Sequence, residues 1–127
     1  MHLVPSDRAN HRIIDDERVC DAIGGIGDPD HVATEADRFA LLGDPTRLTL
    51  LIAIHHAGPI SVSDLAVAAD MNDTTVSQAL RLLRAKSSVA AARDGRVVRY
   101  RLADDSLAEL LERVSPRSAT RHSAAAT

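Results

Sequence analysis

Two short helical segments, joined by a tight turn at residues 70–73, restrict the fold of this chain more than any other feature of its sequence. The first is predicted over residues 62–69, because Ser61 and Asp64 resemble a helix capping box in which Asp replaces the usual Glu. The second is predicted over residues 74–85. Its inward-facing apolar residues recur at helical spacing: Val76, Leu80 and Leu83. Together the two segments predict a helix–turn–helix unit.

A β-hairpin and a final helix are predicted after this unit. The apolar segments 89–92 and 97–102 flank Asp94-Gly95, a dipeptide typical of hairpin turns. The last helix is predicted over residues 104–114, with an apolar stripe of Leu107, Leu110, Leu111 and Val114.

Two further helices are predicted before residue 58. One covers residues 30–42. The other begins at Pro45, with Asp44 as its N-cap, and is apolar on most sides, which is typical of a buried helix. The order α-α-α-α-β-β-α over residues 30–114 predicts a mainly α fold with a β-hairpin wing. We expect residues 1–29 to be a flexible arm with a candidate short helix at 15–26, broken by the glycines that follow, and residues 115–127 to be a disordered tail.

Composition agrees with packed helices and excludes several protein classes. With one Tyr, one Phe and no Trp, the core is built from aliphatic residues, and a chain of 127 residues buries limited surface alone, so we expect oligomerisation. One cysteine excludes a disulfide framework within the chain. The longest apolar stretch, residues 50–54, is far shorter than the roughly 18 residues that span a bilayer, and the N-terminus lacks a secretory signal pattern. The sequence predicts a cytoplasmic protein without a membrane partner.

Charge is divided unevenly along the chain. Residues 1–70 carry 5 basic and 12 acidic residues, whereas residues 71–103 carry 7 basic and 2 acidic residues, a local net charge of +5 in a chain of net charge −3. Such a basic segment indicates a site for a polyanion. It contains no His or Cys, and no glycine-rich loop follows a predicted strand anywhere in the chain, so we expect no enzyme.

The predicted helix 74–85 has the side chains that a DNA recognition helix needs. Short hydrogen-bonding groups near its N-terminus suit base edges, and these are Thr74, Thr75, Ser77 and Gln78. Arg81 and Arg84 lie further along and suit phosphates, while Arg93 and Arg96 flank the hairpin tip. Two alternatives remain open: an ordinary solvated face, and a winged-helix module whose basic face binds an acidic protein.

Four segments of the chain resemble the ArsR/SmtB family of bacterial winged-helix repressors. The similarity covers about residues 35–114 and rests on these segments: Leu42-Gly43-Asp44-Pro45-Thr46-Arg47-Leu48, Val62-Ser63-Asp64-Leu65-Ala66, Val76 to Arg84, and Arg93 to Leu102. The resemblance implies a homodimer, held by the first and last helices, that binds a palindromic operator in double-stranded DNA. It also implies release by a metal ion or another small effector, although a repressor without ligand sensing stays open.

The metal-binding positions of that family are mostly not matched. The family's cysteine-containing pair is replaced by Ser61 to Asp64, and its last-helix Asp-x-His by Asp104 and Ser106. The candidates for a divalent transition metal are therefore Cys20, His31 and Asp104. For Cys20 the favoured interpretation is a small half-buried hydrophobe, and a thiolate ligand or a disulfide between subunits is the alternative. Adjacent side chains on a helix point about 100° apart, so we do not expect His55 and His56 to share a metal.

The residue after the helix at 74–85 departs from the family pattern. A glycine is usual near that C-terminus, whereas this chain has Lys86-Ser87-Ser88. We therefore expect a less favoured residue in a left-handed conformation, at a cost of roughly 1 kcal/mol.

Overall fold

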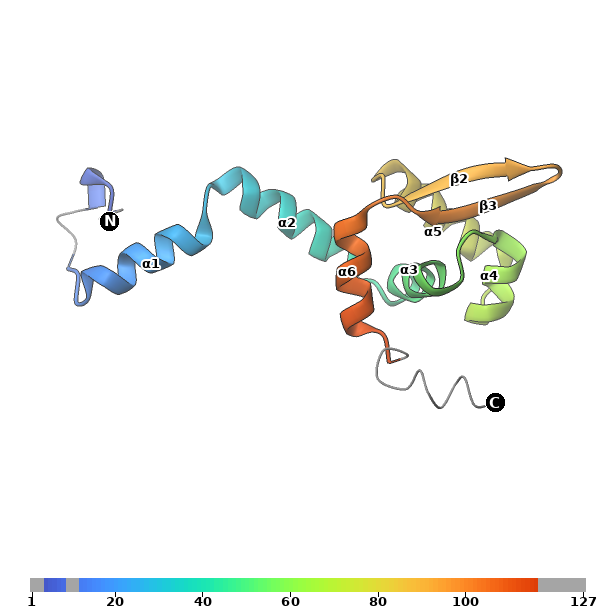
Figure 1. The fold of residues 1–127 in the computed structure, drawn as a ribbon, viewed down its shortest axis with the longest axis horizontal. Helices are drawn as coiled ribbons and strands as arrows, with labels where there is room; N and C mark the ends of the chain where they lie inside the picture. Colours follow the sequence, from blue (N-terminus) through green and yellow to red (C-terminus); the bar gives the residue numbers. More distant parts are fainter. Residues whose placement is uncertain (1–3, 9–11, 117–127) are drawn as a thin grey trace. The chain divides into compact units, whose positions relative to one another are not determined.

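The computed structural model describes residues 4–8 and 12–116 and divides the chain into two compact units, residues 1–40 and 41–127. In the first unit lie a 3-10 turn, Ser6–Arg8, and the helix α1, Asp16–Ile26, while α2, Pro29–Leu42, extends into the second unit. The remaining elements of the second unit are α3 (Pro45–Ala57), β1 (Ile60–Ser61), α4 (Val62–Ala69), α5 (Asp73–Ala85), β2 (Val89–Asp94), β3 (Val97–Leu102) and α6 (Asp105–Val114) (Figure 1). The predicted order is confirmed, with β1 as an additional strand. Among the described residues, no helix is long and apolar enough to cross a membrane.

The helix boundaries follow from capping side chains. The Asp44 carboxylate accepts a hydrogen bond from the Arg47 amide at 3.0 Å, and Pro45 fills the first helical turn of α3, as predicted. The Asp104 carboxylate accepts hydrogen bonds from the amides of Ser106 and Leu107 and so begins α6. α5 starts at Asp73, one residue earlier than predicted, because Asn72 is its N-cap.

In the first unit, α1 closely matches the candidate helix predicted over residues 15–26. Asp15 is its N-cap, and the helix continues through Gly24 and Gly25. It ends at Ile26, and Gly27 is its C-cap, with a φ of 73° in the region that glycine adopts without steric cost. Cys20, on α1, is buried.

The three-stranded sheet has the order β1-β3-β2, and all its pairings are antiparallel. Asp94 pairs with Val97, so the hairpin loop is Gly95-Arg96 and not the predicted Asp94-Gly95. Gly95 has a φ of 65°, whereas Arg96 is not among the described residues with positive φ. This pattern, with glycine first, is that of a type II′ turn, one of the two turns that match strand twist.

The core of the second unit is aliphatic and lies where the helices meet the sheet. Its fully buried side chains are Leu50, Leu51, Ile54, Leu65, Val76, Leu80, Leu83, Leu107 and Leu111. The predicted stripe of α6 is only partly correct, because Leu110 is half-buried and Val114 is 52% exposed. α6 therefore has an apolar side chain outside this core.

A close backbone approach joins the end of α3 to β3. Gly58 follows α3, and its amide donates to the Ile54 carbonyl at 2.8 Å. A Cβ atom at residue 58 would lie 2.6 Å from the Ile54 carbonyl oxygen and 3.2 Å from that of Tyr100. Only glycine fits between α3 and β3 at this point.

α5 ends in a Schellman motif without glycine. The Ser88 amide donates to the Leu83 carbonyl at 2.9 Å, and the Ser87 amide donates to the Arg84 carbonyl at 3.0 Å. Ser87 is left-handed, with a φ of 60°. The expected departure from glycine is confirmed at this residue.

We predict that Ser87→Gly stabilises the protein by about 1 kcal/mol, because glycine adopts positive φ without a Cβ clash. The free energy of unfolding from urea denaturation measures the effect. Ala85→Gly, two residues earlier in helical conformation, is the matched control and should destabilise by roughly 0.5–1 kcal/mol. Equal destabilisation by both variants would contradict this account of Ser87.

Candidate nucleic-acid interface

α4, the turn and α5 form a helix–turn–helix unit fixed by local hydrogen bonds. The Ser61 hydroxyl accepts from the Asp64 amide at 3.2 Å and begins α4. Asp70 ends that helix in the left-handed conformation, with a φ of 56°. The Asn72 side chain then accepts from the Thr75 amide at 2.8 Å and begins α5. Only residues 70–72 separate the helices, so their relative placement has little freedom.

The two faces of α5 have opposite character. Val76, Leu80 and Leu83 are fully buried, as predicted. On the other face, five of the predicted contact residues are exposed: Thr74, Ser77, Gln78, Arg81 and Arg84. Thr75 is half-buried. α5 therefore has hydrogen-bonding groups near its N-terminus and cations towards its C-terminus on one exposed surface.

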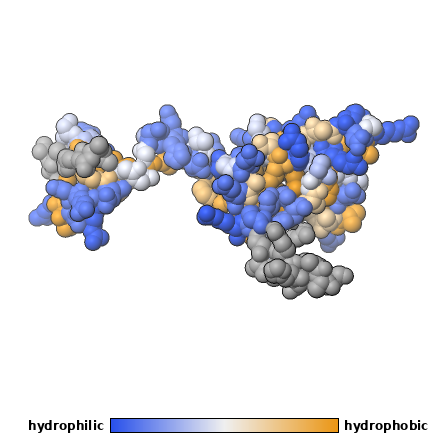
Figure 2. Space-filling view, in the orientation of Figure 1, coloured by the Kyte–Doolittle hydropathy of each residue, from blue (hydrophilic) through white to orange (hydrophobic). Residues whose placement is uncertain are grey.

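The hairpin adds exposed cations next to α5, which packs against β2. Arg93 lies on β2 opposite Val98, Arg96 lies in the loop, and both side chains are exposed. Figure 2 shows hydrophilic residues at the projecting end of the hairpin. Within the described part of the chain, none of four arginines forms an ion pair: Arg81, Arg84, Arg93 and Arg96. Their charges are available to an external anion.

Arg99 has a different role, which the sequence-based predictions do not include. Its Nη1 lies 2.6 Å from Oδ2 of Asp94, the acidic residue nearest the hairpin tip. Arg99 pairs with Ala92 across the strands, so it is a diagonal neighbour of Asp94 on the same face. The pair offsets the negative charge at the hairpin tip. Placing the two-residue loop one residue later in the sequence would have predicted the Arg99–Asp94 pair.

The three predicted metal candidates do not form a metal-ligand group among the described residues. Cys20 is buried on α1, and His31 lies in the first turn of α2, where its amide donates to Asp28. The Asp104 carboxylate caps α6 and also accepts from the Ser106 hydroxyl at 2.7 Å. The Asp104 carboxylate, the one family ligand that this chain retains on the last helix, therefore serves as a helix cap.

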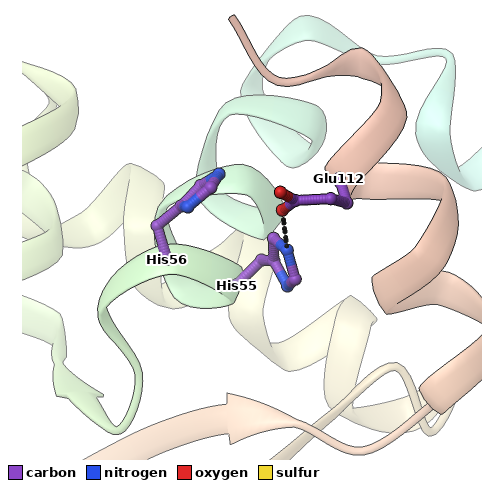
Figure 3. A group of neighbouring side chains, drawn as sticks. All are labelled: His55, His56 and Glu112. Carbon is purple, nitrogen blue, oxygen red and sulfur yellow. Dashed lines mark hydrogen bonds and ion pairs between the residues drawn. The ribbon is translucent and has the colours of Figure 1, made fainter. Parts of the chain in front are cut away.

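The sequence predicts that the side chains of His55 and His56 point apart, whereas the structure brings them together. Together with Glu112 they form the one group of three in the described structure whose ligand atoms lie within 4.8 Å of one another. Their ring centroids are 4.8 Å apart, and both rings lie beside the carboxylate of Glu112, which reaches from α6 (Figure 3). The 100° rule describes Cβ directions. It does not account for the length of the two imidazole side chains at the end of α3, or for a third side chain that comes from α6.

The chain is similar to known transcriptional regulators in sequence. No protein-family model matches the chain. The chain is 37% identical over 86 residues to the transcriptional repressor SmtB homolog of Synechocystis sp., and this covers 68% of the chain and 64% of that protein. It is 38% identical over 85 residues to the HTH-type transcriptional regulator NmtR of Mycobacterium tuberculosis, covering 67% of the chain and 70% of NmtR. The chain thus spans just under two thirds of the length of the first relative.

Solved structures show the same fold. The antimony-specific transcriptional repressor AntR has a TM-score of 0.62 and 26% identity, with 87% of both chains covered. The homodimeric winged helix-turn-helix DNA-binding domain Mb0332 of Mycobacterium bovis, a possible ArsR-family regulator, has a TM-score of 0.56 and 30% identity. It covers 75% of this chain and 91% of that domain.

We predict that Asn72→Ala destabilises the protein by about 1 kcal/mol, because the Thr75 amide loses its side-chain acceptor at the start of α5. Thermal or urea unfolding checks this value. Asn72→Ser is the control, since serine caps helices about as well as asparagine, and it should stay within a few tenths of a kcal/mol of the original. If both variants unfold at the same denaturant concentration, the cap is not what fixes the start of α5.

Proposed function

Because the chain belongs to the ArsR/SmtB family of winged helix-turn-helix repressors, we propose that it is an autoregulatory repressor that binds a palindromic operator in DNA as a homodimer. The observation that carries this proposal is the exposed face of α5, where hydrogen-bonding groups and arginines without ion-pair partners in the described structure share one surface with the hairpin. Relatives of the chain are a transcriptional repressor and a transcriptional regulator, and no enzymatic role is proposed. The site of action is the cytoplasm.

The proposed complex assigns α5 to the major groove and the hairpin to the adjacent backbone or minor groove. Thr74, Thr75, Ser77 and Gln78 contact base edges, because their groups are short and lie near the N-terminus of α5. Arg81 and Arg84 bind phosphates along the groove. Arg93 and Arg96 of the hairpin bind the adjacent backbone or the minor groove. Thr75 contributes less than the other three polar residues, since it is half-buried.

Dimerisation is assigned to α2 and α6. Each carries apolar side chains that stay exposed in the single chain: Val32 is 46% and Phe39 60% exposed on α2, and Val114 is 52% exposed on α6. Burying such groups in a partner lowers the free energy of the dimer. A two-fold axis would also place two copies of α5 in successive major grooves.

A metal or metalloid ion is the proposed effector class. AntR, a structural neighbour, is described as antimony-specific. The family's last-helix site does not fit this chain, because serine stands at residue 106 and its hydroxyl donates to Asp104. An effector ion would therefore bind elsewhere.

We predict that Arg81→Ala and Arg84→Ala weaken binding to operator and scrambled duplexes alike. Affinity should fall steeply with salt, and each lost phosphate contact should reduce the log–log slope by roughly 1 unit. Fluorescence anisotropy of a labelled duplex from upstream of the gene measures both effects, with Arg18→Ala of α1 as control. If the original protein retains no duplex at moderate salt, a module that binds an acidic protein becomes the better explanation.

Gln78→Ala should act differently from the arginine variants. Losing a base contact should cost about 1–3 kcal/mol on the operator and leave binding to scrambled DNA nearly unchanged. The same anisotropy assay on paired duplexes gives the ratio. Equal losses on both duplexes would contradict the role assigned to Gln78.

A further inference from the structure

The group of His55, His56 and Glu112 lies outside the DNA-binding surface and joins two helix ends. Both histidines are in the last turn of α3, and Glu112 is in the last turns of α6. Nε2 of His55 is 2.7 Å from Oε2 of Glu112 (Figure 3). The side chains of His55 and Glu112 are 19% and 39% exposed, so the group is sheltered and still reachable from solvent.

The donor set suits a divalent transition metal ion. Two imidazole nitrogens and one carboxylate oxygen are ligands that Zn²⁺, Co²⁺ and Ni²⁺ accept, with a further position for water. Ligand atoms about 2.0–2.2 Å from a tetrahedral ion lie roughly 3.3–3.6 Å apart. The three atoms here lie within 4.8 Å of one another, and the His55–Glu112 hydrogen bond is 2.7 Å long. Side-chain rotations that move the ligand atoms by about 1 Å would therefore lengthen the His55–Glu112 separation and shorten the widest separation in the group.

Surrounding groups favour a cation and orient the ligands. α3 ends at Ala57 and α6 ends at Val114, so two helix C-termini, each with partial negative charge, lie at the ends that carry these residues. The Ser115 hydroxyl lies 2.7 Å from Nε2 of His56, and Ser115 is buried. A hydrogen bond of this kind fixes the ring of a metal-binding histidine.

We propose that His55, His56 and Glu112 bind one divalent first-row transition metal ion within a single subunit. The ion would link the end of α3 to α6. Its role as effector rests on the proposed function: α3 packs against both α5 and α6, so an ion at this point can change the relative position of the DNA-contacting helix and the proposed dimer helix.

The test is a titration of the metal-free full chain with Co²⁺ and Zn²⁺. Co²⁺ should give the visible absorption of a low-coordinate site at one ion per subunit, and Zn²⁺ should displace it and raise the Tm by several degrees. His55→Gln, His56→Gln and Glu112→Gln should each weaken binding by at least roughly 10–100-fold, the loss typical when even a partner of a ligand is removed. Glu109→Gln, at an exposed position on α6, is the control and should bind as the original chain does.

The variants must be compared with metal-free melting curves. A variant that melts like the original without metal but gains no Tm from Zn²⁺ supports the site, and any one such variant suffices. Full-strength Co²⁺ binding by the His55→Gln, His56→Gln double variant would overturn the proposal, as would the absence of binding by the original chain.

DNA binding is measured separately on metal-free protein. Duplex retention without any metal binding would leave the repressor proposal standing and refute the metal site. Metal binding without duplex binding would support the metal site and refute the repressor proposal. If both occur, the affinity for duplex with and without Zn²⁺ gives the coupling between the two sites.

Discussion

The burial of one apolar stripe on α5 determines how the rest of the molecule can be used. Val76, Leu80 and Leu83 are almost fully removed from solvent, and burying each such side chain contributes about 1.5–3 kcal/mol. No other rotation of α5 about its axis buries these three residues. The packing of the core therefore determines which face of α5 is exposed, and the polar groups on that face take no part in this packing.

Much of the fold could be predicted because the chain marks its helix ends with side chains. Ser61, Asn72 and Asp104 each bind a backbone amide at the start of a helix, and helix periodicity supplies the buried residues between caps. β1 was missed because two residues have no periodicity. The hairpin turn was misplaced by one residue because Asp-Gly and Gly-Arg both fit a two-residue loop, and only strand pairing distinguishes them.

The functional surface was predictable to a lesser extent, and for a physical reason. Residues on one helix face can be identified from spacing alone, which is why five of the predicted contact residues of α5 are exposed. A site made by two helices depends on their packing. His55 and Glu112 are 57 positions apart, and nothing local in the sequence indicates that α3 and α6 end side by side. The net charge of −3 is equally uninformative, since it averages over a surface where basic residues are concentrated.

The close backbone approach at Gly58 means that the hairpin can move little relative to the end of α3. Backbone oxygens of Ile54 and Tyr100 both crowd the place where a side chain would begin, so the spacing between the end of α3 and β3 is set by main-chain contact. Main chain compresses far less readily than side chains repack. A small displacement of the last turn of α3, where both histidines lie, would therefore also move the hairpin, because side-chain repacking cannot compensate for it.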